Sequence, residues 1–240
     1  QFLSMPMLRN IFAQKENKID FEDIMNSQKI VLLNLSKGKI GEENASFFGS
    51  MFITKIKQAG MARAKIREEN RTDFYLYVDE FHNLVTASFI NLFSEARKYG
   101  LDLTVAHQYT AQLIPAVFAT VLGNVANIII FRVGGDDSEK LEPEMAPIFK
   151  AKDMINLGTQ EFYIKETIDG ETYDPFSAET LRIMKAPHSS FRDRIIKTSR
   201  EKYARSADEV KEMLRMEEGS ARARISASIS KEEEMPEPLM

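Results

Sequence analysis

The sequence contains no cysteine, which excludes disulfide bonds and cysteine-based metal sites and is compatible with a reducing compartment. It has no apolar run approaching the ~20 residues that a membrane-spanning helix needs, and no stretch resembles a signal peptide. The formal net charge is only -4 over 240 residues, so the composition carries no overall basic signal for nucleic acid.

The hydrophobic content of 43% and the 16 phenylalanines are enough for a sizeable core, in one large domain or one domain with appendages. Charge is uneven along the chain. Residues 182–205 hold eight basic and two acidic residues, which favours a contact with DNA or another partner. Three consecutive glutamates, Glu232 to Glu234, stand near the end.

Four short apolar runs recur along the chain. They are "KIVLLNL" (29–35), "FYLYV" (74–78), "LDLTVA" (101–106) and "NIIIFRV" (127–133). Near-continuous apolar runs are typical of strands that are covered on both faces of a parallel sheet. The sequence therefore predicts an α/β fold with a mostly parallel sheet and helices on both faces.

The segments between the runs have helical patterns. Residues 44–59 and 86–99 each place their large apolar side chains on one face. Thr86 is suited to cap the start of the second helix, and Gly100 is suited to the left-handed position after its end.

The pattern changes after Leu157. Asp169-Gly170 separates two partly alternating runs, which predicts a β-hairpin over 161–177. "SADE" (206–209) predicts the start of a helix that ends near Gly219. Residues 220–240 have too little apolar mass to fold alone, and we predict that they are disordered.

Two acids, Asp79 and Glu80, directly follow the second run. Ligands of open parallel sheets lie beyond the carboxyl ends of the strands. There Asp79 can hold Mg²⁺, directly or through water, and Glu80 can orient an attacking water. The alternative is that the acid pair simply begins a polar loop.

Three further side chains are candidates for the same chemistry. Gln108 follows the third run, so it falls at the same sheet edge and can contact a γ-phosphate or the attacking water; the alternative is a polar loop residue. Arg97 lies at a helix end, where it complements the helix dipole or acts as an arginine finger on a neighbouring subunit. Arg132, inside the fourth run, is a second candidate for the arginine finger, because an arginine in such an apolar run needs an acidic or phosphate partner.

Other signals are weaker. "DEFH" (79–82) also fits the DExH box of helicases, but the Ser-Ala-Thr segment expected after it is absent. His82, His107 and His188 lack a metal-ligand spacing and favour structural or exposed positions. "SKGKIG" (36–41) predicts a loop between strand and helix, with a DNA-backbone contact as the functional alternative.

Together, "KIVLLNLSKGKIGEENASFFGSMF", "FYLYVDEFHN", "LFSEARKYGLDLTVAHQYTAQL" and "IIIFRVGGDDSEKL" resemble the C-terminal part of the FtsK/HerA superfamily of DNA-pumping ATPases. Within it, they are most similar to the TraG/TraD-like coupling proteins of type IV secretion and conjugation. The resemblance covers roughly residues 25–182. It implies a RecA-like fold, a homo-hexameric ring around DNA, and ATP and Mg²⁺ as cofactors.

The resemblance also implies roles for individual residues. Asp79 and Glu80 match the Walker B acids, Gln108 matches the sensor glutamine, and Arg97 matches the arginine of the helix after Walker B. It further implies a cytoplasmic location at the inner face of the cell membrane, with secretion-channel and relaxosome components as partners. Membrane association would then come only through these partners or a missing N-terminal region.

One element of the family is missing. The phosphate-binding loop G-x-x-x-x-G-K-[ST] does not occur in the sequence; at Gly38-Lys39 the next residue is Ile40, and Leu33 stands in place of the first glycine. We therefore expect that the chain is the C-terminal part of a longer ATPase. We also expect that this chain alone neither binds ATP tightly nor hydrolyses it. The rival is a naturally degenerate subunit.

On this interpretation residues 1–28 end an upstream helical segment, 29–182 form the incomplete RecA-like core, and 183–240 form a charged helical and then disordered tail. Two other functions stay open. One is a docking or recruitment module without turnover, and the other is an ATPase of the same secretion machinery that exports protein instead of DNA.

Overall fold

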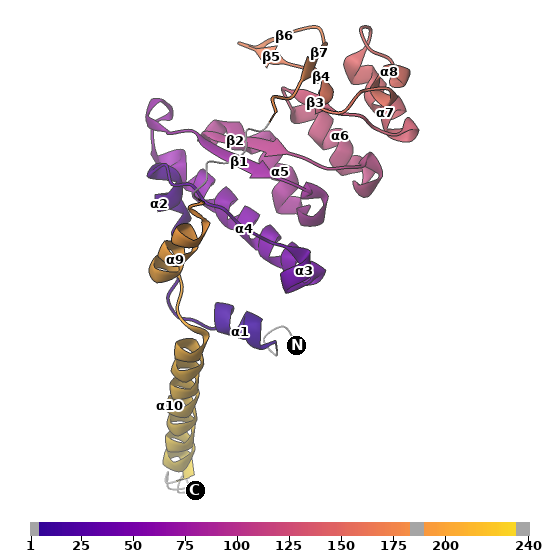
Figure 1. Ribbon diagram of the computed structural model, residues 1–240. Helices are drawn as coiled ribbons and strands as arrows, with labels where there is room; N and C mark the ends of the chain where they lie inside the picture. The colour runs from indigo at the N-terminus through magenta and orange to yellow at the C-terminus, as the bar shows by residue number, and fades with distance from the viewer. Residues whose placement is uncertain (1–4, 183–189, 234–240) are drawn as a thin grey trace, which may run out of the picture. The chain divides into compact units, whose positions relative to one another are not determined.

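The computed structural model describes residues 5–182 and 190–233 (Figure 1). The chain divides into two compact units. The first comprises Gln1–Asp20 and Lys185–Met240, and the second comprises Phe21–Met184. In the part of the chain that is described, no helix combines the length and the apolar character needed to cross a bilayer.

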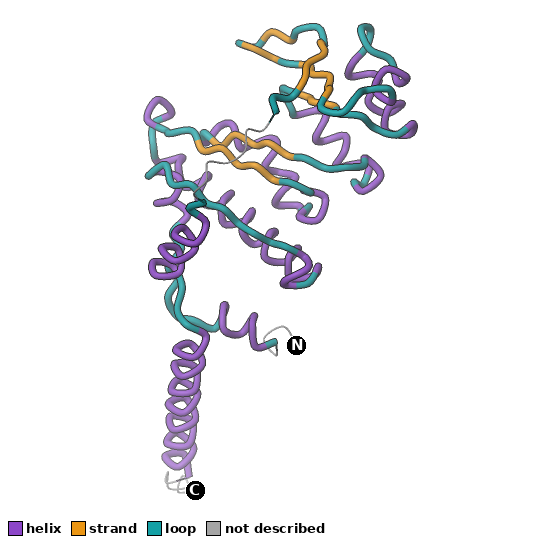
Figure 2. The backbone as a smooth tube through the Cα atoms, in the orientation of Figure 1, coloured by secondary structure: helices purple, strands orange, loops and turns teal. Residues whose placement is uncertain are grey.

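A parallel strand pair lies at the centre of the second unit. β1 (Phe74–Val78) pairs with β2 (Leu101–Val105) in a register that runs from Phe74 opposite Leu101 to Val78 opposite Val105 (Figure 2). The second and third apolar runs are therefore neighbouring parallel strands, as predicted, and both end at the same edge.

Helices cover one face of this strand pair. They are α2 (Phe21–Asn26), α4 (Glu42–Ala62), α5 (Ala87–Glu95) and α6 (Pro115–Asn124). The core between helices and strands contains Met25, Ile53, Val78, Phe81, Phe89, Leu92, Leu101, Val117 and Val121. The α/β class is confirmed.

The opposite face of the strand pair carries no helix among the described residues, whereas the sequence predicts helices on both faces. Tyr75 and Tyr77 point outward and are 60% and 73% exposed. The aromatic run of β1 predicts burial on both faces. Tyrosine can nevertheless stay exposed, because its hydroxyl group can hydrogen-bond to water. This is why β1 alternates in the structure although its sequence does not.

The helix predicted over 86–99 has the predicted ends. The Thr86 side chain accepts a hydrogen bond of 3.2 Å from the Phe89 backbone N–H at the start of α5. A 3-10 turn, η5 (Ala96–Tyr99), follows α5, and Gly100 adopts a left-handed φ of 63°. A side chain there would have to adopt a conformation that glycine reaches without strain.

The first apolar run is not a strand. Residues 29–35 form extended chain without sheet pairing in the described structure, and Ile30 and Leu32 are 90% and 80% exposed. A groove of about 1100 Å³ separates this segment from β1. The apolar residues of this run indicate a tendency toward burial. Strand pairing also needs a neighbouring strand in register, and the hydrophobic pattern of one segment does not specify that neighbour. A short helix, α3 (Lys37–Ile40), follows the segment.

The fourth run contains a strand, but in a separate antiparallel sheet. β3 (Ile128–Ile130) pairs with β4 (Glu161–Lys165), which pairs with β7 (Phe176–Glu179). Ile130 packs on Met145 of α7 (Gly135–Met145) and Met154 of α8 (Ala151–Ile155). The run is apolar because it packs on these helices, and its composition does not reveal the direction of its partner strand.

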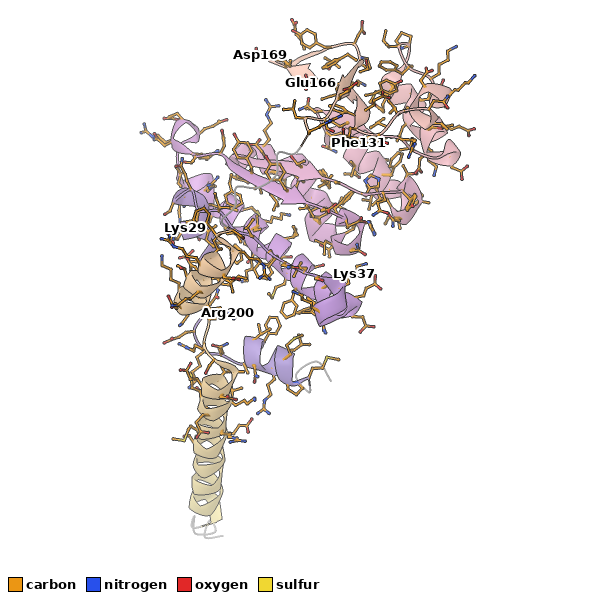
Figure 3. The ribbon with its side chains drawn as sticks, in the orientation of Figure 1. Lys29, Lys37, Phe131, Glu166, Asp169 and Arg200 are labelled. Carbon is orange, nitrogen blue, oxygen red and sulfur yellow. The ribbon has the colours of Figure 1, made fainter. Side chains whose placement is uncertain are left out.

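The predicted hairpin is confirmed. β5 (Thr167–Ile168) and β6 (Glu171–Thr172) are joined by Asp169 and Gly170, whose φ values of 52° and 85° are both positive. Positive φ at both central residues is the geometry that an Asp-Gly turn favours. Asp169 is labelled at the tip of this hairpin in Figure 3.

The first unit contains α1 (Pro6–Phe12), α9 (Arg192–Tyr203) and α10 (Ala207–Glu233). The predicted capping box is present, because Ser206 and Glu209 exchange hydrogen bonds of 3.0 and 3.2 Å between side chain and backbone N–H. The predicted helix end near Gly219 is wrong, because α10 continues to Glu233, whereas disorder of residues 220–240 in isolation stays a prediction. One glycine costs about 1 kcal/mol in a helix, which does not stop a long helix. Residues 234–240 lie outside the described part.

Candidate active site

The backbone after β1 stays attached to the backbone after β2. The Ala106 N–H donates to the Val78 carbonyl at 2.9 Å, and the Phe81 N–H donates to the Ala106 carbonyl at 3.1 Å. These two bonds extend the parallel pairing past the strand ends. They bring Asp79 and Glu80 beside the segment that carries Gln108.

The turn at Glu80 is left-handed, with φ 50° and ψ 42°. Such a conformation costs a non-glycine residue roughly 1–2 kcal/mol and is found preferentially at functional sites. The Asp79 carboxylate accepts the Glu80 backbone N–H at 2.9 Å. Phe81, which is completely buried, anchors the turn by packing against Phe89, Phe93 and His107.

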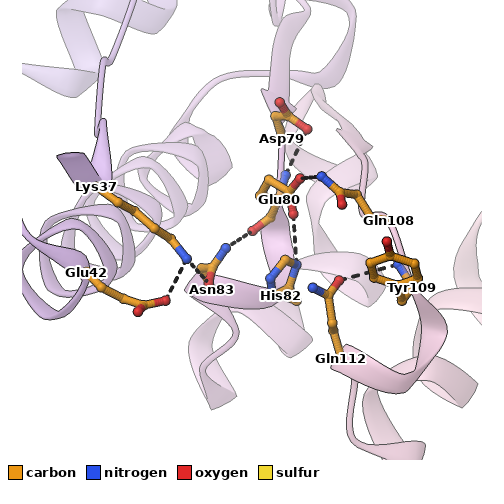
Figure 4. A network of polar contacts seen from close by, with 9 residues as sticks. All are labelled: Lys37, Glu42, Asp79, Glu80, His82, Asn83, Gln108, Tyr109 and Gln112. Carbon is orange, nitrogen blue, oxygen red and sulfur yellow. Dashed lines mark hydrogen bonds and ion pairs between the residues drawn. The ribbon is translucent and has the colours of Figure 1, made fainter.

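Both oxygens of the Glu80 carboxylate have neighbours (Figure 4). Gln108 Nε2 donates to Oε1 at 2.5 Å, and His82 Nδ1 lies 3.4 Å from Oε2 without hydrogen-bond geometry. The structure thus brings Glu80 and Gln108 together, as their positions after two parallel strands predict. Asp79 is exposed beside them. Their catalytic roles stay predictions.

A second set of hydrogen bonds, through Asn83, holds the backbone carbonyl of Glu80. The backbone N–H and the side-chain Nδ2 of Asn83 both donate to the Glu80 carbonyl at 3.1 Å. The Ser46 hydroxyl of α4 donates to the Asn83 carbonyl at 2.5 Å. Lys37 Nζ donates to Asn83 Oδ1 at 2.9 Å and to Glu42 Oε1 at 2.6 Å.

The segment that carries Gln108 is fixed by a buried carboxylate. Asp137 Oδ1, in the first turn of α7, accepts the Thr110 backbone N–H at 3.2 Å and the Thr110 hydroxyl at 2.5 Å. Lys140 Nζ donates to the same hydroxyl oxygen at 3.1 Å. Because Thr110 is two residues from Gln108, these bonds restrict where the glutamine side chain can reach.

His107 is half-buried between the acids and this cluster. Burial lowers its pKa, as does the neighbouring His82, whereas Asp137 and Glu80 raise it. Burial is the largest of these effects, so the imidazole is held toward its neutral form.

Among the described residues, neither Arg97 nor Arg132 forms a hydrogen bond or ion pair with Asp79, Glu80 or Gln108. Arg97 is exposed in η5, near Asp102 at the opposite edge of the strand pair, where the Phe74 N–H donates to the Gly100 carbonyl at 2.9 Å. Arg132, just beyond β3, is also exposed. Because its charge is in contact with water, it needs no acidic or phosphate partner in the fold. His82 is the one histidine that approaches a candidate acid closely in the described residues.

The acids fit a magnesium ion that is shared with a phosphate. Mg²⁺ is usually held by one or two carboxylates together with substrate phosphates and water. Asp79 could supply one such carboxylate, with Glu80 free to act on a nearby water, and the described residues contain no cluster of three or more possible metal ligands. The sequence lacks the glycine-rich loop that would hold the phosphates, so this chain's residues alone do not fit ATP.

Several contributors to the site are not evident from the sequence. Asn83 and Asp137 belong to no recognisable motif, and Lys37 falls in "SKGKIG", which predicts a loop or a DNA-backbone contact. Lys37 follows the first apolar run, which forms no strand in the described structure, so a shared sheet edge does not account for its contact with Asn83. The contact between Asp137 and Thr110 joins residues 27 positions apart and has no signature in the sequence.

No protein-family model matches the chain, and neither does any curated protein. Among solved structures, an unbound monoclinic form of the bacterial conjugative coupling protein TrwBdeltaN70 is similar, with a TM-score of 0.45 and 14% identity. That similarity covers 53% of this chain, and this chain spans only 35% of the length of the coupling protein.

The genome packaging NTPase B204 of Sulfolobus turreted icosahedral virus 2 is similar in complexes with AMPPCP and with ATP-gammaS. Both have TM-scores of 0.46 and 18% identity, and cover 70% of this chain and 74% of the other.

Proposed function

We propose that the second unit contributes the acid and sensor residues of a nucleoside-triphosphate-hydrolysing motor whose phosphate-binding loop lies outside these 240 residues. The observation that carries the proposal is the contact between Glu80 and Gln108 beside the exposed Asp79. A strained turn, a carboxylate pair and an amide meet at the carboxyl edge of parallel strands, where open α/β sheets bind ligands.

Each side chain has a distinct task in this proposal. Asp79 contributes a carboxylate ligand to Mg²⁺, and the metal when bound offsets negative charge on the phosphates. Glu80 orients a water and accepts its proton. Gln108 fixes the orientation of the Glu80 carboxylate by donating a hydrogen bond to one of its oxygens at the carboxyl edge of the strand pair.

The proposed substrate is DNA, moved by a homo-hexameric ring that serves a type IV secretion or conjugation system. The support is the resemblance of four ordered sequence segments to conjugation motors of the FtsK/HerA superfamily. Export of protein by a related motor is the second candidate. Stimulation of nucleotide turnover by DNA, measured on a protein that also carries the phosphate-binding loop, distinguishes the two.

Metal binding tests the proposal on this chain itself. Mn²⁺ replaces Mg²⁺ at carboxylate sites and broadens NMR signals of nearby nuclei. We expect MnCl2 to broaden the backbone amide signals of Asp79, Glu80 and Gln108 first, and those of Arg97 and Lys98, at the opposite edge, much later. Asp79→Asn should remove the selective broadening because it removes the charge but keeps the shape.

The matched control is Asp102→Asn, which changes an acid at the other end of the same strand pair. It should leave the broadening pattern unchanged. Equal broadening at both edges, or broadening of Glu80 that persists in Asp79→Asn, would contradict the metal-binding role. A docking module without turnover predicts this negative result.

A further inference from the structure

The side-chain amide of Asn83 has only one orientation that satisfies its neighbours. An ammonium group can donate hydrogen bonds but cannot accept them. The Asn83 oxygen must therefore face Lys37 Nζ, at 2.9 Å, which turns Nδ2 toward the Glu80 carbonyl, at 3.1 Å. Lys37 in this way fixes which end of the amide points at the turn that carries the acid.

Lys37 comes from a distant part of the chain. It lies 46 positions before Asn83, in the short α3 that precedes α4. Its ammonium also donates to Glu42 Oε1 at 2.6 Å, in the first turn of α4. Figure 4 shows the resulting line of contacts from Glu42 through Lys37 and Asn83 to Glu80 and Gln108.

We propose that Lys37 is a positioning residue that controls the geometry of Glu80 through the side-chain amide of Asn83. With Lys37 in place, two donors from Asn83 hold the Glu80 carbonyl, and this supports the left-handed turn at φ 50°. Without the ammonium, the amide can rotate and the second donor is lost. The turn then leaves its strained conformation part of the time, and the carboxylate loses its fixed direction toward Gln108.

This arrangement connects the segment between 36 and 42 to the candidate catalytic acid. Any change that breaks the hydrogen bond between Lys37 and Asn83 would alter the conformation of Glu80 without contacting Glu80 itself. The consequence for hydrolysis rests on the proposed function, but the conformational link from Lys37 to Glu80 is a property of this chain and can be measured without nucleotide.

NMR on the whole chain tests the link. The three-bond HN–Hα coupling of Glu80 reports its φ, and the side-chain amide signals of Gln108 report the contact with the carboxylate. We expect Lys37→Met to shift and broaden these signals, because Met preserves much of the side-chain length but cannot donate. Lys37→Arg should restore the wild-type signals, since a guanidinium can donate to the same oxygen.

Two further variants separate positioning from general effects. Lys39→Met removes an exposed lysine from the same short helix and should leave the Glu80 and Gln108 signals unchanged. Asn83→Asp, which cannot donate from its side chain when ionised, should reproduce the effect of Lys37→Met. The thermal unfolding midpoint should stay unchanged in both lysine variants.

The proposal is overturned if Lys37→Met leaves the Glu80 coupling and the Gln108 signals at their wild-type values, or if Lys39→Met alters them equally. Its failure is distinguishable from failure of the proposed function. Loss of the Mn²⁺ effect at Asp79 with an intact link between Lys37 and Glu80 would contradict only the function. An intact Mn²⁺ effect with no response to Lys37→Met would contradict only the link.

Discussion

Gln108 Nε2 donates a 2.5 Å hydrogen bond to Glu80 Oε1, across 28 positions of the chain. The two residues meet because β1 and β2 are parallel neighbours, and Ala106 extends their pairing beyond the strand ends. The contact gives the acid a fixed direction at the edge where an open α/β sheet binds ligands. Four predictions test the structure and the site.

Arg63, at the end of α4, is 1% exposed and joins three parts of the second unit. Its guanidinium donates at 3.1 Å to the carbonyls of Tyr99 and Gly100 and to Asn26 Oδ1. We predict that Arg63→Met lowers the free energy of unfolding by roughly 2–4 kcal/mol, because it removes the three hydrogen bonds that this buried guanidinium donates. Urea unfolding measures the change.

Arg67→Met is the matched control, because the Arg67 side chain is 83% exposed. It should change the free energy of unfolding by less than about 0.5 kcal/mol. Equal stability of the Arg63 and Arg67 variants would show that the buried guanidinium contributes nothing net.

His107 predicts a pH dependence of stability. Its pKa is lowered in the folded state, chiefly by burial and then by His82, while Asp137 and Glu80 act in the opposite direction. The unfolded chain therefore binds a proton at a higher pH than the folded chain. Stability from this residue is fully present above its ordinary pKa of about 6.5 and is lost as the pH falls from there toward the folded value.

Urea unfolding between pH 8 and pH 5 measures this loss. We expect His107→Gln to give a flatter dependence of the unfolding free energy on pH in this window, whatever its effect at pH 8. A variant whose pH dependence overlays that of the wild type would show that His107 does not contribute to it.

Arg97 predicts a contrast between stability and turnover. It lies at the edge opposite Asp79, so it cannot serve the acids of its own chain by direct contact, and any catalytic role must act on a neighbouring subunit. Arg97→Ala should cost no more than about 1 kcal/mol of stability. If Arg97 is a finger acting in trans, the same change should lower turnover by about 10³–10⁵-fold in an assembled motor.

Mixed rings provide the measurement. An Arg97→Ala subunit with an intact phosphate-binding loop is combined with a subunit that keeps Arg97 but has a mutated loop. Partial return of activity supports action in trans. No return, in rings shown to have exchanged subunits, would eliminate Arg97 and leave Arg132 as the better candidate.

Local signals in the sequence predicted local structure well. Thr86 and Gly100 bound a helix, and Asp169-Gly170 forms a turn, because each depends on contacts within a few residues. The apolar run at 29–35 forms no strand in the described structure, and the run at 127–133 supplies its predicted strand to an antiparallel sheet, since apolar composition reports burial and not the identity of a partner strand. Gly219 did not end its helix, because one weak helix former is outweighed by its neighbours.

In the site too, some contacts could be predicted from the sequence and others could not. The meeting of Glu80 and Gln108 was predictable, because the carboxyl ends of neighbouring parallel strands lie together. The residues that support them were not predictable. Lys37 reaches Asn83 and Asp137 reaches Thr110 through side chains of elements far apart in sequence, whose packing only the folded chain specifies.

The catalytic role of Glu80 is tested by Glu80→Gln in a protein that carries this chain together with an in-frame phosphate-binding loop. The substitution keeps the size of the side chain but removes the negative charge that orients water and accepts a proton. We expect that ATP still binds while steady-state turnover falls by at least about 10²-fold. Normal turnover by the Glu80→Gln protein would contradict it and would leave Glu80 as a residue of the loop alone.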